Sequence, residues 1–253
     1  MMFPKISVIV PCYNYERYIE KCLISIVLQH RNFNVEILVG NDNSTDNSLK
    51  IVNRFAKYYE SDNLKFKIYS HNTNLGEISN TKFLLENCEG EYIAYLDADD
   101  YWIDPNKLKR QIEFLDNNKD YSVCVTGYIQ LLNDINYIPS VDFSNWLCPI
   151  DVNRLNAESL TSGNIVGSSS SRLFRNYKDL VKDYFYEFPY SDWVINFELA
   201  LKGKIGYLDF PSYVYRIHDN SLSKKDYQTE NPEELYKKRV NILKSELDKH
   251  INN

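Results

Sequence analysis

Three carboxylates stand together where an apolar-rich segment ends. Residues 91–96 lead directly into Asp97-Ala98-Asp99-Asp100. Asp97 and Asp99 are two positions apart, so in an extended chain their side chains point the same way. Like charges this close repel each other unless a cation or a proton lies between them. A hard divalent cation, Mg²⁺ or Mn²⁺, prefers such oxygen ligands, so one interpretation of the cluster is a metal site. The simpler interpretation is an acidic loop that caps a helix.

A second acidic segment, residues 41–46, follows the apolar run at 35–39. Ser44 to Asp46 are typical turn and cap residues. Asp42 has a further use, because a carboxylate at this place accepts hydrogen bonds from a nucleobase N–H or a ribose hydroxyl in dinucleotide-binding folds. The first apolar run is followed by Pro11-Cys12-Tyr13-Asn14, and the sequence has neither a GxGxxG nor a GxxxxGK[ST] pattern. A nicotinamide-dependent dehydrogenase and a P-loop NTPase are therefore disfavoured.

Two later segments also carry side chains suited to chemistry. Tyr190-Ser191-Asp192-Trp193 stands at the start of a helical pattern, where Ser191 or Asp192 would simply cap the helix in the alternative interpretation. Tyr215-Arg216-Ile217-His218 closes the last predicted strand. Its arginine would neutralise a phosphate and its histidine would bind a metal or touch a substrate, unless the two form only a surface pair.

The elements that must position these residues alternate along the first half of the chain. Strands are predicted at residues 6–10, 35–39, 66–69, 91–96 and 121–128. Helices are predicted at 19–27, from a cap at Ser44 or Thr45 to 59, at 76–87, and at 106–118 after Asp104-Pro105. This order indicates an α/β protein with a doubly wound, mostly parallel sheet and ligands at the carboxyl ends of its strands.

The second half has a weaker pattern. Residues 131–170 mix Asn, Ser, Pro and aromatic residues without a clear period, which predicts loops that cover the sheet. Further on, the pattern predicts a helix at 192–202, short strands at 205–208 and 214–217, a polar stretch at 221–231, and a last helix that begins at Pro232.

The composition excludes several classes of protein. The formal net charge of the 253 residues is −6, which argues against a nucleic-acid polymer as partner. The five cysteines form no CxxC pair and the four histidines no cluster, so neither a disulfide framework nor structural zinc is expected. The sequence shows no signal peptide and no apolar stretch of about 20 residues. We expect a cytoplasmic protein that acts in solution or at the inner face of the membrane.

Taken together, the segments resemble family 2 glycosyltransferases with a GT-A fold, over about residues 4–224. The resemblance is carried by residues 6–14, 36–46, Asn74-Leu75-Gly76, 90–100, 191–193 and 215–223. It implies a GT-A domain at 1–224, with a nucleotide-binding half at about 1–128 and a loop-rich acceptor-side half at about 129–224. A C-terminal helical extension at 225–253 would follow.

The same resemblance implies roles for individual residues, with Asp192 as the catalytic base. The nucleotide would contact Pro11, Tyr13, Asn14, Asp42, Lys82, Asp97 and Ala98. The Mn²⁺ or Mg²⁺ cofactor would be bound by Asp99, Asp97 and His218. The donor sugar or the acceptor would contact Asp100, Trp102 and Arg216. Trp102, Trp146 and Trp193 could each stack on a sugar or pack in the core, and we favour the core for Trp193.

The sequence departs from the family pattern at two places. Asn41 stands where the family often has Asp, and Thr81-Lys82 where it often has Arg-Asn. Lys82 would supply a point charge in place of the missing arginine, but without the bidentate geometry of a guanidinium. These departures put the affinity for the nucleotide or the preference for its base in question.

The implied function is inverting transfer of a sugar from a nucleotide-sugar, usually a UDP-sugar, to a hydroxyl of a glycan, glycolipid or glycoprotein, in bacterial surface polysaccharide biosynthesis. A nucleotidyltransferase that makes the activated sugar and a non-catalytic sugar-nucleotide-binding protein are the alternatives. Acceptor recognition is expected within residues 128–190. The basic residues beside the apolar stripe of the last helix would suit a membrane surface or a homodimer, although a solvated amphipathic helix is favoured.

Overall fold

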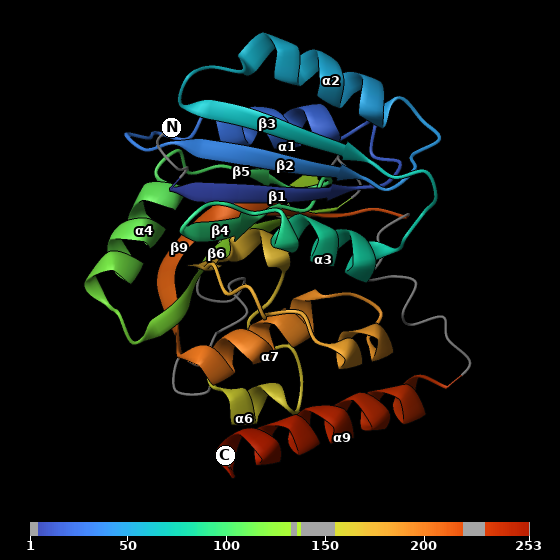
Figure 1. Ribbon diagram of the computed structural model, residues 1–253, viewed down its shortest axis with the longest axis vertical. Coiled ribbons are helices and arrows are strands. Elements are labelled where there is room, and N and C mark those ends of the chain that lie inside the picture. The colour runs from blue at the N-terminus through green and yellow to red at the C-terminus, as the bar shows by residue number, and fades with distance from the viewer. Residues whose placement is uncertain (1–4, 133–135, 138–154, 220–230, 253) are drawn as a thin grey trace.

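The computed structural model describes residues 5–132, 136–137, 155–219 and 231–252 (Figure 1). Trp146 and most of the polar stretch at 221–231 lie outside the described residues.

Four parallel strands form the first part of the sheet, in the spatial order β3-β2-β1-β4. They are β1 (Ile6–Cys12), β2 (Val35–Asn41), β3 (Leu64–Ser70) and β4 (Tyr92–Tyr95). The helices that connect them are α1 (Ile19–Val27), α2 (Ser48–Tyr59) and α3 (Glu77–Glu86). The chain moves from β1 outward to β3 and then returns to the other side of β1, which places a topological switch point between β1 and β4.

Alternate residues of these strands face opposite sides of the sheet, and both sides are covered. Val8 and Val10 belong to the apolar cluster that contains α1 and α2, whereas Ile9 belongs to the cluster that contains α3. This burial on both faces explains why the strands read as continuous apolar runs rather than as alternating ones.

The second part of the sheet is mixed. It continues from β4 through β8 (Leu173–Arg175), β6 (Tyr121–Leu132) and β9 (Lys204–Ile217) to β5 (Tyr101–Trp102), and β7 (Asn136–Tyr137) pairs with β6. β8 is antiparallel to both β4 and β6, whereas β6 and β9 are parallel. The predicted α/β fold is confirmed: β1 to β4 are all parallel, and the second part of the sheet combines the parallel pair β6–β9 with antiparallel pairs.

Strand β9 corrects one prediction. The apolar runs at 205–208 and 214–217 are one strand, because the polar residues between them form an irregularity where Leu208 and Pro211 pair with successive residues of β6. Such bulges accommodate extra residues and a proline within a continuous strand.

Two helix starts also differ from the prediction. The hydroxyl of Ser44 accepts a hydrogen bond from the Asn14 amide rather than capping α2, which begins at Ser48. Helix α4 (Lys107–Asn117) begins two residues after Pro105, and Asp104 accepts a hydrogen bond from the residue before the helix. Local sequence does not reveal that the loop after β2 is tied to the loop after β1.

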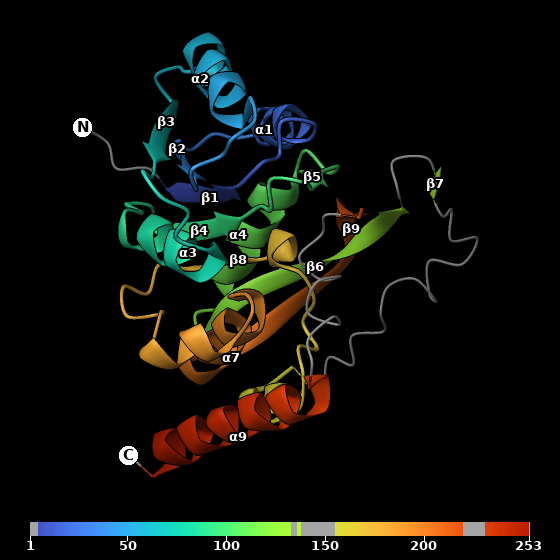
Figure 2. The ribbon, with the colours of Figure 1, turned by 90° about the vertical axis from the view of Figure 1, so that its right-hand side faces the viewer.

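The short helix η2 (Ser169–Ser171) lies against β4, β6 and β9. The other helices of the second half form a layer below the sheet in Figure 1 and are α6 (Ala157–Leu160), η3 (Asp183–Glu187), α7 (Asp192–Lys202) and α9 (Pro232–Ile251). In Figure 1, α9 lies along the lower edge next to α6 and α7, far from α2, and the view in Figure 2 shows the same arrangement. Leu243 anchors α9 in the core, so this helix is docked on one side rather than surrounded by solvent. Within the described ranges, no helix is both long and apolar enough to cross a membrane.

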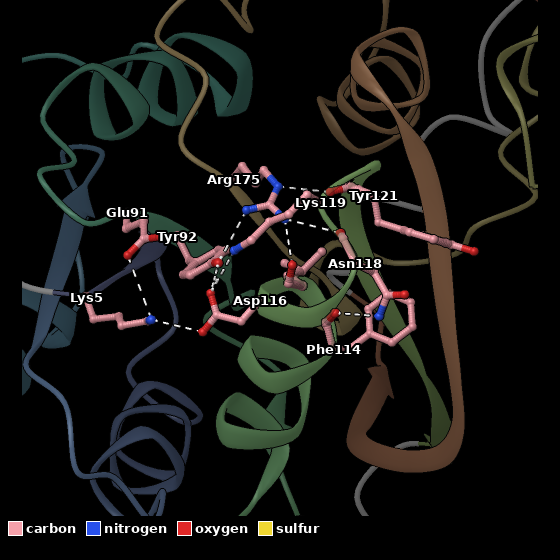
Figure 3. Close-up of polar contacts among 10 residues, drawn as sticks. Lys5, Glu91, Tyr92, Phe114, Asp116, Asn118, Lys119, Tyr121 and Arg175 are labelled. Atoms are coloured by element: carbon pink, nitrogen blue, oxygen red, sulfur yellow. Dashed lines mark hydrogen bonds and ion pairs between the residues drawn. The ribbon is translucent and has the colours of Figure 1, made fainter.

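A polar cluster fixes the end of the sheet where the parallel strands begin (Figure 3). Arg175 of β8 donates a hydrogen bond to the carbonyl oxygen of Tyr121, and Asp116 of α4 accepts hydrogen bonds from Lys5 and Tyr92. Lys5 precedes β1 and Tyr92 opens β4. Because the predicted site residues follow the opposite ends of these strands, this cluster supports the fold and not the site.

Candidate active site

Two cavities lie at the carboxyl ends of β1, β2 and β4. The first, called here the strand-end cavity, has a volume of about 480 Å³ and lies at the switch point. The second, the central cavity, has a volume of about 170 Å³. Both are lined by Tyr15, Glu77, Asp97 and Asp99, so they are neighbours that share one wall.

The strand-end cavity contains most of the residues predicted to contact a nucleotide. Those that line it are Pro11, Tyr13, Asn14, Asp42, Asp97 and Ala98. The loop after β1 is fixed to the loop after β2, because the Asn14 side chain accepts a hydrogen bond of 2.8 Å from the Thr45 amide. Tyr13 is 45% exposed and offers a ring on which a base could stack.

Asp42 is buried and held by the backbone of the turn that precedes α3. One carboxylate oxygen accepts a hydrogen bond from the Leu75 amide at 2.7 Å and the other from the Gly76 amide at 2.9 Å. These bonds fix the carboxylate in the wall of the strand-end cavity. Each oxygen retains acceptor capacity for a ligand N–H or O–H.

Asp97 and Asp99 lie in a turn, not in the extended chain from which their common direction was predicted. The amide of Asp100 donates a hydrogen bond of 3.0 Å to the carbonyl oxygen of Asp97 and closes this turn. Both side chains nevertheless line the same two cavities. Burial, and next the charge of Asp99, raise the pKa of the Asp97 carboxyl well above its usual range.

Asp100 does not reach either cavity. It is 1% exposed and accepts hydrogen bonds from the hydroxyl of Ser170 at 2.7 Å and from the amide of Arg216 at 2.9 Å. Asp100 therefore lies behind the cavity walls, and its contact with a sugar stays a prediction. Its carboxylate holds the strand β9 and the helix η2 against the Asp97–Asp99 turn.

Arg216 and His218 reach the same turn from the end of β9. The Arg216 Nε donates a hydrogen bond of 2.7 Å to the carbonyl oxygen of Asp99, and its guanidinium lies over the ring of Tyr18. Arg216 also lines the central cavity. His218 Nε2 lies 3.0 Å from a carboxylate oxygen of Asp99. The antiparallel pairing of β5 with β9 brings these distant segments together.

Asp192 opens α7 and lines the central cavity together with Asp97 and Asp99. One of its oxygens accepts a hydrogen bond of 2.7 Å from the Trp193 amide, and the other accepts one of 2.8 Å from the Asn164 side chain. Burial raises the pKa of the Asp192 carboxyl to about 6, although the positive charge of Arg172 opposes this effect. A carboxylate with such a pKa is suited to accept a proton near neutral pH.

Two charged residues not predicted from the sequence, Glu77 and Arg172, hold the segment around Asp192. Glu77 accepts hydrogen bonds from both the amide and the hydroxyl of Ser191, at 2.8 and 2.6 Å, and from the Tyr95 hydroxyl. Arg172 is fully buried, and its guanidinium donates to the carbonyl oxygen of Asp192. A glutamate in the first turn of a helix is common because it interacts favourably with the helix dipole, so its presence in the sequence does not predict the contact with Ser191.

The serine run at 168–171 also supports the site, although its composition indicated only a loop. The hydroxyl of Ser170 lies within hydrogen-bonding distance of carboxylate oxygens of both Asp97 and Asp100. Ser168 and Ser169 line the central cavity. A hydroxyl can donate one hydrogen bond at a time, so Ser170 links two carboxylates without neutralising them.

Two other predicted contact residues, Trp102 and Lys82, do not line either cavity. Trp102 is 4% exposed and packs in the core, where its indole N–H donates a hydrogen bond to the carbonyl oxygen of Ser170. Lys82 lies on α3, and its contact with the nucleotide stays a prediction.

Two residues that depart from the family pattern, Asn41 and Thr81, lie in the protein interior. Asn41 is buried and donates a hydrogen bond to Ser70 on the neighbouring strand. Thr81 is buried and its hydroxyl contacts Glu77 and Tyr95. Neither side chain forms part of a cavity wall.

The donor atoms around the Asp97–Asp99 turn fit a hard divalent cation. Two carboxylates with crowded negative charge face the same space, and a cation there would relieve their repulsion. Among the described residues, no group of three His, Cys, Asp or Glu side chains has an arrangement that could hold a metal ion. Mg²⁺ is commonly held by only one or two carboxylates together with substrate phosphates, so the two-carboxylate set is compatible with such a site.

The fold and the cavity wall define the class of protein as a GT-A-type α/β enzyme fold with acidic residues at the switch point. Over residues 7–180 the sequence matches Glycosyl transferase family 2, and the chain belongs to this family.

Relatives in sequence agree with this assignment. The putative glycosyltransferase EpsH of Bacillus subtilis is 28% identical over 230 residues, which are 88% of this chain and 63% of EpsH. An uncharacterized protein of Mycobacterium tuberculosis is 29% identical over 216 residues, which are 85% of this chain and 60% of that protein. The chain thus spans about three fifths of the length of these relatives.

Solved structures share the fold. Residues 1–349 of S. aureus TarS in complex with UDP-GlcNAc superpose with a TM-score of 0.62 at 24% identity, covering 87% of this chain and 60% of that one. The mannosyltransferase PcManGT from Pyrobaculum calidifontis, in complex with GDP-Man and Mn²⁺, gives a TM-score of 0.64 at 16% identity, covering 89% and 61%.

Proposed function

We propose that the protein transfers a sugar, with inversion, from a UDP-sugar to a hydroxyl of a glycan, glycolipid or glycoprotein acceptor. The observation that carries the proposal is that Asp192 lines the same small cavity as Asp97 and Asp99. Membership of family 2 supports glycosyl transfer. The complexes of TarS with UDP-GlcNAc and with UDP support a uridine nucleotide as the donor's leaving group.

In the proposed reaction the nucleotide occupies the strand-end cavity. Asp42 accepts a hydrogen bond from the base, and Tyr13 stacks on it. The diphosphate reaches the Asp97–Asp99 turn, and the donor sugar enters the central cavity. An acceptor hydroxyl then attacks the anomeric carbon while the bond from this carbon to the diphosphate oxygen breaks. The proton of the hydroxyl passes to Asp192, and the nucleoside diphosphate leaves with the bonding electrons.

Asp99 and Asp97 would hold a Mn²⁺ or Mg²⁺ ion, with His218 beside Asp99 fixing the direction of that carboxylate. The bound ion would supply Lewis-acid stabilisation of the negative charge on the leaving diphosphate. Arg216 lines the central cavity and adds positive charge near the phosphates. Asp97 and Asp99 thus suit a cation that joins the protein to an anionic donor.

A donor screen tests the proposal. We expect UDP-sugars to raise the melting temperature only in the presence of Mn²⁺ or Mg²⁺, because a ligand that binds the folded state alone stabilises it. GDP- and dTDP-sugars at the same concentration are the comparison. The absence of any metal-dependent shift would contradict the proposal. Release of pyrophosphate from a sugar phosphate and a nucleoside triphosphate would instead indicate a nucleotidyltransferase.

The rate of transfer should depend on pH through Asp192. Its pKa is raised to about 6, chiefly by burial, and only the deprotonated carboxylate accepts a proton. At saturating donor and metal, kcat should therefore fall about tenfold for each pH unit below 6 and reach a plateau above about pH 7. A kcat that stays constant between pH 5 and pH 8 would show that Asp192 is not the base.

A further inference from the structure

A third cavity, called here the outer cavity, lies on the other side of Asp192. It has a volume of about 280 Å³ and is formed by α7, the segment at 188–190 and the C-terminal helix α9. Asp192 and Tyr190 line both the outer and the central cavity. The three cavities therefore follow one another, with Asp97 and Asp99 at the first junction and Asp192 at the second.

Two aromatic rings form a rigid part of the outer cavity. Trp193 of α7 and Tyr236 of α9 stack with their centroids 6.1 Å apart and an interplanar angle of 25°. The Trp193 indole N–H donates to the carbonyl oxygen of Leu160, and the Tyr236 hydroxyl donates to that of Ser162. Because both rings are already held in place, a ligand that stacks on them would not need to order them.

The outer cavity combines apolar and aromatic lining residues with a few polar side chains, one of which is bonded to the proposed base. Asn164 donates a hydrogen bond of 2.8 Å to Asp192, and Arg239 of α9 lines the same space. An apolar and aromatic wall with a few placed polar groups is typical of a small-molecule site. A pyranose fits this chemistry, because its C–H face stacks on an aromatic ring while its hydroxyls need hydrogen-bond partners. The volume is close to the lower limit of about 300 Å³ for such sites and suits one or two sugar rings rather than a protein surface.

We infer that the outer cavity binds the sugar ring of the acceptor, a pyranoside whose attacking hydroxyl faces Asp192, and that α9 completes the acceptor site. This inference rests on the proposed function. It extends acceptor recognition beyond residues 128–190, where the sequence placed it, to Tyr236 and Arg239 on the last helix. The docking of α9 through Leu243 then has a role in the reaction as well as in stability.

Binding of methyl pyranosides to the full chain, saturated with UDP and Mn²⁺, tests the inference by ligand-observed NMR. The probes are the methyl glycosides of glucose, galactose, N-acetylglucosamine and rhamnose. At least one should bind the wild type, and Tyr236→Ala and Arg239→Met should each weaken its binding about tenfold or more. Tyr236→Phe keeps the ring and should retain most of the affinity. Tyr58→Ala is the matched control, because Tyr58 is 79% exposed on the distant helix α2.

The variants should leave the Mn²⁺-dependent thermal shift with UDP-sugar unchanged, which shows that they fold. If none of the four glycosides binds the wild type, or if binding is the same in Tyr236→Ala, the inference is overturned. Transfer to a glycoside with an unchanged acceptor KM in Tyr236→Ala would refute the acceptor site but leave the proposed function standing. Binding that depends on Tyr236 without any release of UDP would leave the sugar site standing and refute the proposed function.

Discussion

Replacement of Asp192 by asparagine is expected to lower kcat for sugar transfer by about 10²–10⁴-fold, the usual contribution of a general base. The asparagine can still accept the hydrogen bond from the Trp193 amide, so the start of α7 should be preserved. It cannot take a proton from the acceptor hydroxyl. The affinity for the donor should remain within about twofold of the wild type, because the nucleotide contacts lie in the strand-end cavity on the far side of Asp97 and Asp99.

This variant should not fail by unfolding. Burial raises the pKa of the Asp192 carboxyl, so above about pH 6 the charged side chain costs stability and a neutral amide should give an equal or higher melting temperature. Kinetics with saturating UDP-sugar and calorimetric donor binding check the two expectations. Asp62→Asn, on an exposed loop, is the matched control and should transfer as the wild type does. Transfer by Asp192→Asn at a near wild-type rate would remove Asp192 from the reaction.

Replacement of Asp99 by asparagine should abolish the metal-dependent part of donor binding and lower transfer by at least about a hundredfold. Removal of one carboxylate leaves Asp97 as the remaining acidic group of the proposed metal site, and the shape of the turn is retained by the hydrogen bond from the Asp100 amide. The loss should appear as a UDP-sugar affinity that no longer responds to Mn²⁺ in titration calorimetry.

His218→Gln separates metal binding from orientation. Glutamine can still donate a hydrogen bond toward Asp99, so this variant should keep a metal-dependent response with an affinity lowered by about 10–100-fold, as expected for an outer partner of a metal ligand. If Asp99→Asn binds UDP-sugar as tightly as the wild type and with the same response to Mn²⁺, the proposed metal site is wrong.

Local patterns were sufficient for most of the elements. The apolar run at 6–10 predicted β1, and the helix predicted at 192–202 agrees with α7. These patterns are the continuous apolar run of a strand buried on both faces and the 3.6-residue period of a helix, which depend only on neighbours in the chain. The rule that ligands gather at the carboxyl ends of parallel strands predicts that Pro11, Asp42 and Asp97 lie together, and all three line the strand-end cavity.

The contacts that hold the site residues in place depend on pairing between segments far apart in the chain. Local sequence patterns do not predict such pairing. Strand β8 pairs with β4 in antiparallel register, with Leu173 opposite Ala94. This register carries the serine run to the turn after β4, so that Ser170 meets Asp97 and Asp100. No local period marks these contacts, because Ser170 is 73 positions from Asp97 and 70 from Asp100.

The sequence by itself determined the α/β class and the order in which strands and helices follow one another along the chain. It also determined which polar residues stand at the ends of the strands. These features follow from local periodicity and turn chemistry. Only the tertiary structure decided which of the chosen side chains face a cavity. Asp100 and Trp102 are buried, and Lys82 lines neither the strand-end nor the central cavity. Glu77 and Tyr236, which the sequence did not indicate, each line a cavity. The physical reason is that exposure of a side chain depends on which distant segments pack over it, and that packing is a property of the whole chain.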